Sequence, residues 1–158
     1  MNLRIAGIVD DSIVDGEGIR LTVFTQGCPH HCHGCHNPQT WSFTGGHEID
    51  TEDIIERVKA NPLLSGVTFS GGEPFLQPAP LAEIARAVHQ LGLNVWSYTG
   101  FTLEQLKQRT DARQLLEEVD VLVDGPYIEA LRDLTLRFRG SSNQRILNLA
   151  ELRKKAAA

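Results

Sequence analysis

The sequence contains three cysteines, and all of them lie in one short loop, residues 27–37. Cys28, Cys32 and Cys35 have the spacing C-x3-C-x2-C. An odd, clustered set of cysteines is a poor basis for disulfides and is typical of a metal site. A [4Fe–4S] cube has four irons, which cysteine thiolates usually bind. Three thiolates would leave one iron open for a substrate, as catalytic zinc ions keep one position open.

Zinc is the alternative metal, because the same loop holds four histidines. His30, His31, His33 and His36 make a Cys3His site chemically possible. Structural zinc sites usually draw their ligands from two separated pairs, and the sequence offers no second pair of cysteines. The spacing therefore favours the cluster, and we expect the histidines to be solvated or to lie beside the metal ligands.

A second motif, Ser70-Gly71-Gly72-Glu73-Pro74, follows a short apolar run. Glycines at the end of a strand let the backbone approach a ligand closely, since no Cβ stands in the way. The carboxylate of Glu73 can accept a hydrogen bond from an ammonium group. Such a motif is more often only a turn, and its weight comes from its place one strand after the cysteines.

The elements that must position these motifs alternate between strand and helix. Apolar and β-branched runs predict strands over residues 5–9, 19–26, 67–70, 93–98 and 119–123, with weaker candidates at 134–139 and 145–149. Helical spacing predicts helices from residue 51, over 81–91, over 103–118 with a break near Asp111, and over 150–158.

This alternation predicts βαβ units and a parallel sheet. Polar or glycine-rich clusters follow four of the predicted strands, and the carboxyl ends of parallel strands share one side of the sheet. We therefore expect four loops to converge on one site. The chain has room for five or six βα units, which fit either a curved, partly open barrel or a flat doubly wound sheet.

Composition predicts one soluble domain over residues 1–158. The net charge is −5, yet residues 132–158 hold seven of the 15 Lys and Arg and only two of the 20 Asp and Glu. This basic segment is a contact surface or simply a solvated face. Overall acidity argues against non-specific nucleic-acid binding. Without a membrane-spanning run or a signal peptide, we expect a cytoplasmic protein.

Together, the cysteine spacing and Gly71-Gly72-Glu73 resemble the radical S-adenosylmethionine superfamily. The resemblance is closer to the activases of glycyl radical enzymes, and within these to the family that activates anaerobic ribonucleoside-triphosphate reductase. It extends from about Ile13 to Leu147. The segments that carry it are Asp15-Gly16-Glu17-Gly18-Ile19-Arg20, Cys35-His36-Asn37, Leu122-Val123-Asp124-Gly125 and Arg139-Gly140-Ser141-Ser142-Asn143-Gln144.

This resemblance implies a shortened, partly open (βα)6 barrel. Cys28, Cys32 and Cys35 would hold the [4Fe–4S] cluster, and S-adenosylmethionine would chelate the open iron. The remaining implied cofactor contacts are Gly71, Gly72 and Glu73 to the methionyl amino group, Gly34 and His36 around the cluster, and Ser97 and Asp124 near the sugar or methionine portion. Gly34 stands where many members of the superfamily have an aromatic residue, which leaves open whether His36 or Trp41 packs on the adenine.

The activity implied is that of a radical enzyme with no catalytic side chain beyond cluster and cofactor. A flavodoxin- or ferredoxin-like donor would supply one electron, and the 5′-deoxyadenosyl radical would take a hydrogen from a glycine of the reductase. Arg139, Ser141, Asn143 and Gln144 are the candidate partner contacts.

Two other functions stay open from the sequence. One is a radical enzyme for a small molecule, similar to the 7-carboxy-7-deazaguanine synthases. The other is a non-catalytic iron–sulfur or zinc module. The lack of cysteines for a second cluster, and the side opening that a short barrel leaves, favour the activase.

Overall fold

The computed structural model describes residues 1–157. Their strands are β1 (Asn2–Ser12), β2 (Arg20–Thr25), β3 (His47–Asp50), β4 (Gly66–Gly71), β5 (Asn94–Tyr98), β6 (Val121–Asp124) and β7 (Arg145–Asn148). The α-helices are α1 (Thr51–Lys59), α2 (Pro78–Gln90), α3 (Leu103–Lys107), α4 (Arg113–Leu116) and α5 (Leu149–Ala157). Short 3-10 helices lie at Pro38–Thr40, Pro74–Leu76, Thr110–Ala112 and Glu129–Leu131.

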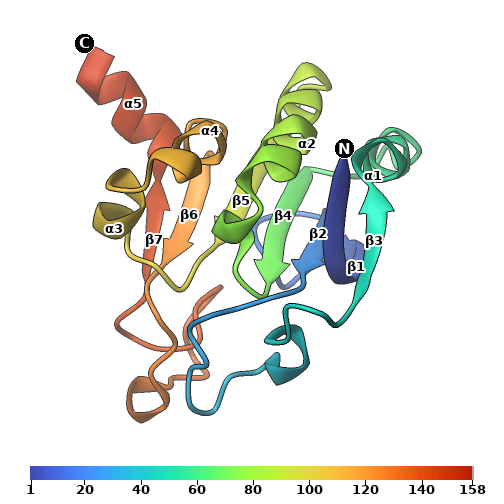
Figure 1. Ribbon diagram of the computed structural model, residues 1–158. Helices are drawn as coiled ribbons and strands as arrows, with labels where there is room; N and C mark the ends of the chain where they lie inside the picture. Colours follow the sequence, from blue (N-terminus) through green and yellow to red (C-terminus); the bar gives the residue numbers. More distant parts are fainter. Residues whose placement is uncertain (158) are drawn as a thin grey trace.

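All seven strands form one open sheet in the order β3-β1-β2-β4-β5-β6-β7 (Figure 1). The four central strands β2, β4, β5 and β6 are parallel. By contrast, β1, β3 and β7 pair antiparallel with their neighbours. The predicted α/β class with a parallel centre is confirmed. The sheet contains both parallel and antiparallel strands and does not close. Residues 1–157 therefore do not form the six consecutive βα units that the resemblance implied.

Helices α1 and α2 form where their sequences combine an apolar face with suitable ends. The side chain of Asp50 accepts a hydrogen bond from the Glu52 N–H and caps α1, which buries Ile54, Ile55 and Val58. In α2 the predicted apolar positions, including Leu81 and Val88, are buried. Gly92 follows α2 with a φ of +78°, a conformation that suits glycine at a helix end.

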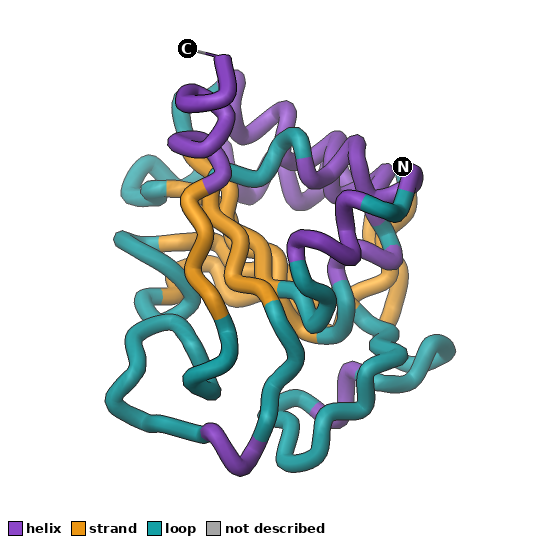
Figure 2. The backbone as a smooth tube through the Cα atoms, turned by 90° about the vertical axis from the view of Figure 1, so that its left-hand side faces the viewer, coloured by secondary structure: helices purple, strands orange, loops and turns teal. Residues whose placement is uncertain are grey.

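The two faces of the sheet have different characters, because successive side chains of a strand point to opposite sides. Figures 1 and 2 show the α-helices gathered on one side of the sheet. The strand residues in the apolar core are Leu3, Ile5, Leu21, Val23, Val67, Phe69, Val95 and Leu122. The alternating positions carry polar and aromatic side chains instead, among them Arg20, Thr68, Ser70, Trp96 and Tyr98.

Arg20 shows how the polar face is held together. Its guanidinium is buried and donates to Thr68 Oγ1 at 2.7 Å, to the Val67 carbonyl at 3.0 Å and to Asn94 Oδ1 at 2.7 Å. The guanidinium also lies 5.5 Å from the ring centre of Trp96. Burial lowers the pKa of Arg20 to about 10. One side chain thus ties together the amino ends of β2, β4 and β5.

Some predicted elements differ from the structure. Residues 134–139 were expected as a weak strand but form a loop, in which Phe138 has a φ of +63° that a continuous strand does not allow. The predicted helix over 103–118 is divided into α3, a 3-10 turn and α4. Strand β3 has no counterpart among the predicted strands. Residue 158 of the predicted last helix lies outside the described residues. In residues 1–157, no helix is long and apolar enough to span a membrane.

Candidate functional site

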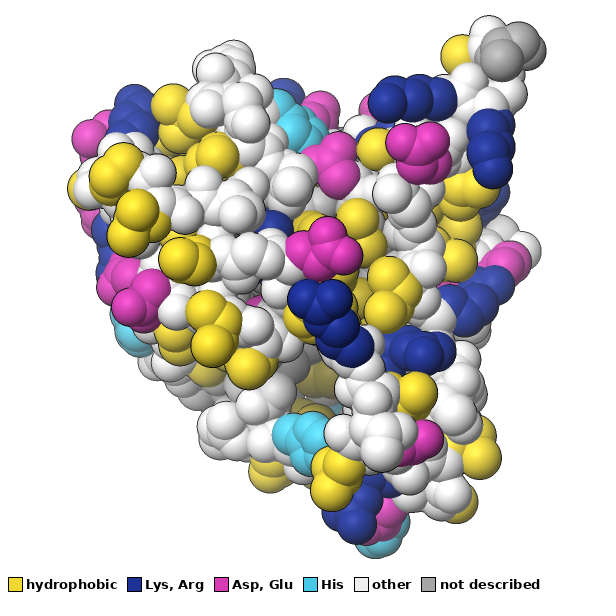
Figure 3. Space-filling model, turned by 180° about the vertical axis from the view of Figure 1, so that it is seen from behind, with side chains coloured by type: hydrophobic (Ala, Val, Ile, Leu, Met, Phe, Trp, Pro, Cys, Tyr) yellow, Lys and Arg dark blue, Asp and Glu magenta, His cyan; other side chains and the backbone are white. Residues whose placement is uncertain are grey.

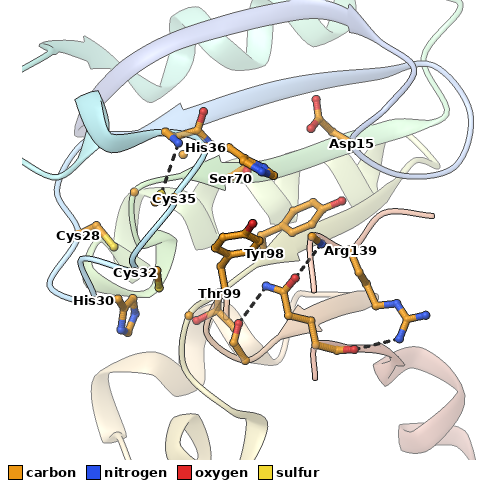
Figure 4. A pocket seen from close by; sticks show the side chains of 18 of the residues that line it. Asp15, Cys28, His30, Cys32, Cys35, His36, Ser70, Tyr98, Thr99 and Arg139 are labelled. Atoms are coloured by element: carbon orange, nitrogen blue, oxygen red, sulfur yellow. Dashed lines mark hydrogen bonds between the residues drawn. The ribbon is translucent and has the colours of Figure 1, made fainter. Parts of the chain in front are cut away.

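A cavity of about 400 Å³ lies where loops gather at the carboxyl ends of the parallel strands. Figure 2 shows these loops together at one end of the sheet, away from α5. The three cysteines lie on one side of the cavity, with Tyr98 and Arg139 on the other (Figure 4). Further lining residues are Val14, Asp15, His30, His36, Asn37, Trp41, Ser70, Gly71, Gly72, Thr99, Gly100, Gly125, Tyr127, Leu136, Phe138, Gly140 and Gln144. The expected convergence of four loops is thus what the structure has.

The cysteine loop is shaped by the segment that follows it. The N–H groups of Gly27 and Cys28 donate to the carbonyls of Thr40 at 2.6 Å and Trp41 at 3.1 Å. The amide of Gln26 donates to the carbonyls of residues 39 and 42. Residues 38–42 therefore fold back beneath the start of the loop and fix it to the end of β2.

The thiols themselves are free and partly enclosed. Cys28 is buried, and Cys32 and Cys35 are half-buried. Burial raises the pKa of the Cys28 thiol to about 11 and also raises the pKa of Cys32. The Asn37 N–H donates to Cys35 Sγ at 3.4 Å. Such thiols must lose their protons to bind a metal, so metal binding here releases protons.

In the described part of the chain, no three His, Cys, Asp or Glu side chains are gathered tightly enough to hold a single metal ion. Ligands of one zinc ion converge on a point about 2.3 Å from each sulfur. All three cysteines line the same cavity, so they are placed to hold a metal centre there.

Gly71 and Gly72 bring the end of β4 against the base of the cysteine loop. The Gly72 N–H donates to the Thr25 carbonyl, and the Glu73 N–H donates to the Gly27 carbonyl, both at 2.8 Å. A Cβ on Gly72 would overlap the Gly27 carbonyl oxygen. Both glycines line the cavity, as expected of residues that let a ligand approach the backbone.

Glu73 does not line the cavity, although the sequence suggested that its carboxylate would meet the cofactor. Its side chain is fully buried and accepts hydrogen bonds from the protein itself. The donors are His30 Nε2 at 2.6 Å, Thr99 Oγ1 at 2.9 Å, the Gly100 N–H at 2.8 Å and the Phe75 N–H at 3.1 Å. These partners occupy both carboxylate oxygens.

Two other predicted cofactor contacts also lie away from the cavity lining. Ser97 is buried and its hydroxyl donates to the Tyr98 carbonyl. Asp124 is buried, accepts from the Leu103 N–H at 2.7 Å and pairs with Arg145 Nε at 2.9 Å. Ser97 lies two residues after Val95, and Asp124 lies two residues after Leu122. Alternate residues of a strand point to the same face of the sheet, so both side chains are on the face that carries the apolar core and not on the cavity side.

The remaining predicted contacts to the cofactor divide in the same way. Gly34 is not among the lining residues, and its Cα faces the Glu129 carboxylate. His36 does line the cavity, and its ring centre lies 5.0 Å from that of Tyr127. Trp41 also lines the cavity but stacks on His31 at 4.5 Å. An aromatic pair, His36 and Tyr127, therefore stands at the cavity wall.

The residues expected to contact a partner mostly close a loop. Gln144 Oε1 accepts from the Gly140 N–H at 2.9 Å, and its Nε2 donates to the Gly125 carbonyl at 3.1 Å. Ser141 is buried and accepts from the Ile128 N–H, and Asn143 donates to the Pro126 carbonyl. Arg139 donates to the Gln144 carbonyl yet still lines the cavity.

Sequence reasoning missed several lining residues, notably Tyr98, Tyr127 and Phe138. Tyr98 had a signal, because it lies in a polar cluster at a strand end. Phe138 had no such signal, since it reaches the cavity from a loop whose sequence predicts a strand, and the centre of its ring lies 5.2 Å from that of Trp96.

Seen from behind, the surface is hollowed beside Lys and Arg side chains, with apolar side chains around them (Figure 3).

The sequence and the fold of this chain are similar to those of known proteins. Residues 14–147 match the family described as a 4Fe-4S single cluster domain. The fold is similar to that of QueE from Escherichia coli, with a TM-score of 0.51 and 18% identity. That match covers 65% of this chain and 54% of QueE, so this chain spans about half of QueE, and the likeness concerns the fold alone.

Curated relatives match over most of their length. The chain is 38% identical over 148 residues to the anaerobic ribonucleoside-triphosphate reductase-activating protein of Pasteurella multocida, covering 88% of this chain and 93% of that protein. The protein of that name from Escherichia coli K12 is 34% identical over 146 residues, covering 87% and 93%. The one from phage T4 is 34% identical over 141 residues, covering 84% and 86%. This chain belongs to the family of anaerobic ribonucleoside-triphosphate reductase-activating proteins.

Proposed function

We propose that this protein is an S-adenosylmethionine-dependent oxidoreductase that installs a glycyl radical on anaerobic ribonucleoside-triphosphate reductase. The observation that carries the proposal is the cavity, where three cysteines of one loop face the glycines that end β4. Cys28, Cys32 and Cys35 would bind three irons of a [4Fe–4S] cluster. A bound cluster would pass one electron from the donor protein to S-adenosylmethionine, and the reductive cleavage would provide the means to remove a hydrogen atom from a glycine Cα.

The chain's own residues bind and orient the cofactor. Gly71 and Gly72 expose backbone at the cavity wall, so carbonyl groups there are suited to receive the methionyl ammonium group. The Glu73 carboxylate would not contact the cofactor, because both of its oxygens already accept hydrogen bonds from the protein. It would instead hold the cysteine loop and the segment after β5 next to Gly71 and Gly72. His36 and Tyr127 provide aromatic surface for the adenine. Ser97 and Asp124 lie outside the cavity lining and would influence the cofactor only through the residues that they contact.

The open shape of the sheet suits a protein substrate. The seven-stranded sheet of residues 1–157 does not close, and we propose that one side of the cavity is open to a protein segment, as in a shortened, partly open barrel of the radical S-adenosylmethionine type. Val14, Leu136 and Phe138 line the cavity together with Arg139 and Asp15. Apolar side chains flanked by charge suit an extended segment of polypeptide. We assign this side to the glycine-bearing segment of the reductase, with a flavodoxin- or ferredoxin-like protein as electron donor in the cytoplasm.

Formation of 5′-deoxyadenosine tests the proposal. Anaerobically reconstituted, dithionite-reduced protein is given S-adenosylmethionine with and without the reductase, and Cys32→Ala serves as the blank. Product above the blank, together with a glycyl radical signal on the reductase, is the expected result. Protein that holds a full complement of iron but forms no product even with the reductase present would refute the proposal.

A further inference from the structure

His30 differs from the other histidines of the cysteine loop in where its side chain lies. Its side chain is only 16% exposed, whereas that of His33 is 95% exposed. The ring of His30 packs edge-on against Phe101, with ring centres 4.6 Å apart. Figure 4 shows it beside Cys32, at the edge of the group of sulfurs. His30 therefore lies at the cavity wall, largely enclosed by protein, between two of the proposed cluster ligands in the sequence.

The partner of His30 is the buried carboxylate of Glu73, at 2.6 Å from Nε2. That carboxylate also receives the Thr99 hydroxyl and the Gly100 N–H, which belong to the segment after β5. Glu73 itself follows β4. A single hydrogen-bonded group thus joins the cysteine loop to the ends of two neighbouring strands.

Gly100 makes room for this arrangement. A Cβ at that position would overlap the His30 ring and stand 2.7 Å from its Nε2. In the described residues, the side chains of His31 and His33 contact residues other than Glu73. His31 stacks on Trp41, and His33 pairs with Glu129 at 3.0 Å. Of these three histidines, His30 is the one whose side chain bonds to a residue that follows a strand of the sheet.

We propose that His30 is a positioning residue that, through Glu73, sets the place of the cysteine loop relative to Gly71 and Gly72. The inference rests on the proposed function for the presence of the cluster and cofactor. The open iron and the backbone that receives the methionyl group lie on two different elements. A chelating cofactor must reach both at once, so its affinity depends on how firmly the two elements are joined.

Two substitutions separate the hydrogen bond from the imidazole ring. The amide nitrogen of glutamine lies about where Nε2 of histidine lies, so His30→Gln keeps a donor within reach of Glu73. The amide of asparagine corresponds to Nδ1 and is too short to reach it, so His30→Asn loses the bond. His33→Asn is the matched control in the same loop, because its side chain is exposed and lies away from Glu73.

The experiment compares the reconstituted proteins by iron and sulfide per chain, by binding of S-adenosylmethionine, and by the change that this cofactor causes in the electron paramagnetic resonance spectrum of the reduced cluster. We expect His30→Asn to keep its iron but to bind S-adenosylmethionine about tenfold more weakly or worse, because Glu73 loses a buried hydrogen bond. His30→Gln and His33→Asn are expected to stay within about twofold of the wild type.

The outcomes separate this inference from the proposed function. Wild-type affinity and an unaltered spectral response in His30→Asn would overturn the inference alone. Equal weakening in His30→Gln and His30→Asn would also overturn it, because the ring and not its bond to Glu73 would then matter. Wild-type protein that takes up no iron would overturn the proposed function, and this inference with it.

Discussion

Replacing Gly72 by alanine tests how closely the cysteine loop is packed against β4. The added Cβ would overlap the Gly27 carbonyl oxygen and stand 2.9 Å from the carbonyl carbon. These are backbone atoms, which cannot turn away as a flexible side chain would. Overpacking of this kind costs about 1–3 kcal/mol. Separation of the two segments also weakens the hydrogen bond from the Glu73 N–H to the Gly27 carbonyl, worth about 1 kcal/mol.

We therefore expect Gly72→Ala to lower the free energy of unfolding by about 2–4 kcal/mol. Urea denaturation of the metal-free protein measures this value. Gly7→Ala is the matched control, because a Cβ on Gly7 in β1 meets nothing within 4 Å. It should leave stability unchanged or raise it by up to about 1 kcal/mol. A Gly72→Ala protein within about 0.5 kcal/mol of this control would refute the claimed packing.

Three further predictions concern the cysteines and the Arg145 ion pairs. Alanine in place of Cys28, Cys32 or Cys35 should abolish 5′-deoxyadenosine formation, and activity in all three variants would contradict the ligand assignment. Arg145→Met leaves buried Asp124 without its charged partner and should cost about 2 kcal/mol in urea denaturation, less than for a fully buried pair since Arg145 is half-exposed; unchanged stability would contradict this. Arg145 also lowers the pKa of Glu104 from 4.5 to about 2. Because the pKa of Glu104 is lower in the folded state, its ionised carboxylate stabilises the fold at pH values above the unfolded pKa, and this stabilisation is lost as the pH falls from 4.5 to 2. The acid-induced loss of stability in this range should therefore be smaller in Glu104→Gln. An identical pH profile would count against the pair.

Most of what the sequence predicted correctly follows from local patterns. The β-branched run of β2 and the apolar spacing of α2 determine those elements almost by themselves. The meeting of the cysteines with Gly71 and Gly72 follows from a topological rule, since both come after parallel strands. Periodicity missed β3, which has few apolar residues and forms because residues 47–50 pair with β1.

The places where the site differs from the sequence-based expectation arise from contacts between distant residues. A carboxylate after two glycines suggests a ligand contact, and only the fold shows that His30, Thr99 and Gly100 already occupy Glu73. Asp124 likewise ends a parallel strand but faces the core side, where Arg145 meets it. Successive side chains of a strand point to opposite faces of the sheet. A polar residue at a strand end therefore faces either the cavity or the core, and a shift of the strand by one residue would exchange the two.

The separation of the cavity from the apolar core has a consequence for how this protein matures. None of the three cysteines belongs to the core cluster, which is built from the helices and the face of the sheet that they cover. In small zinc domains the metal itself drives folding, and chelators unfold the chain. In this protein the core is built without the cysteines, so we expect burial of apolar surface to drive folding before any cluster is bound. We therefore expect the metal-free chain to fold, and oxidative loss of a cluster to leave a folded protein that can be reconstituted with iron and sulfide.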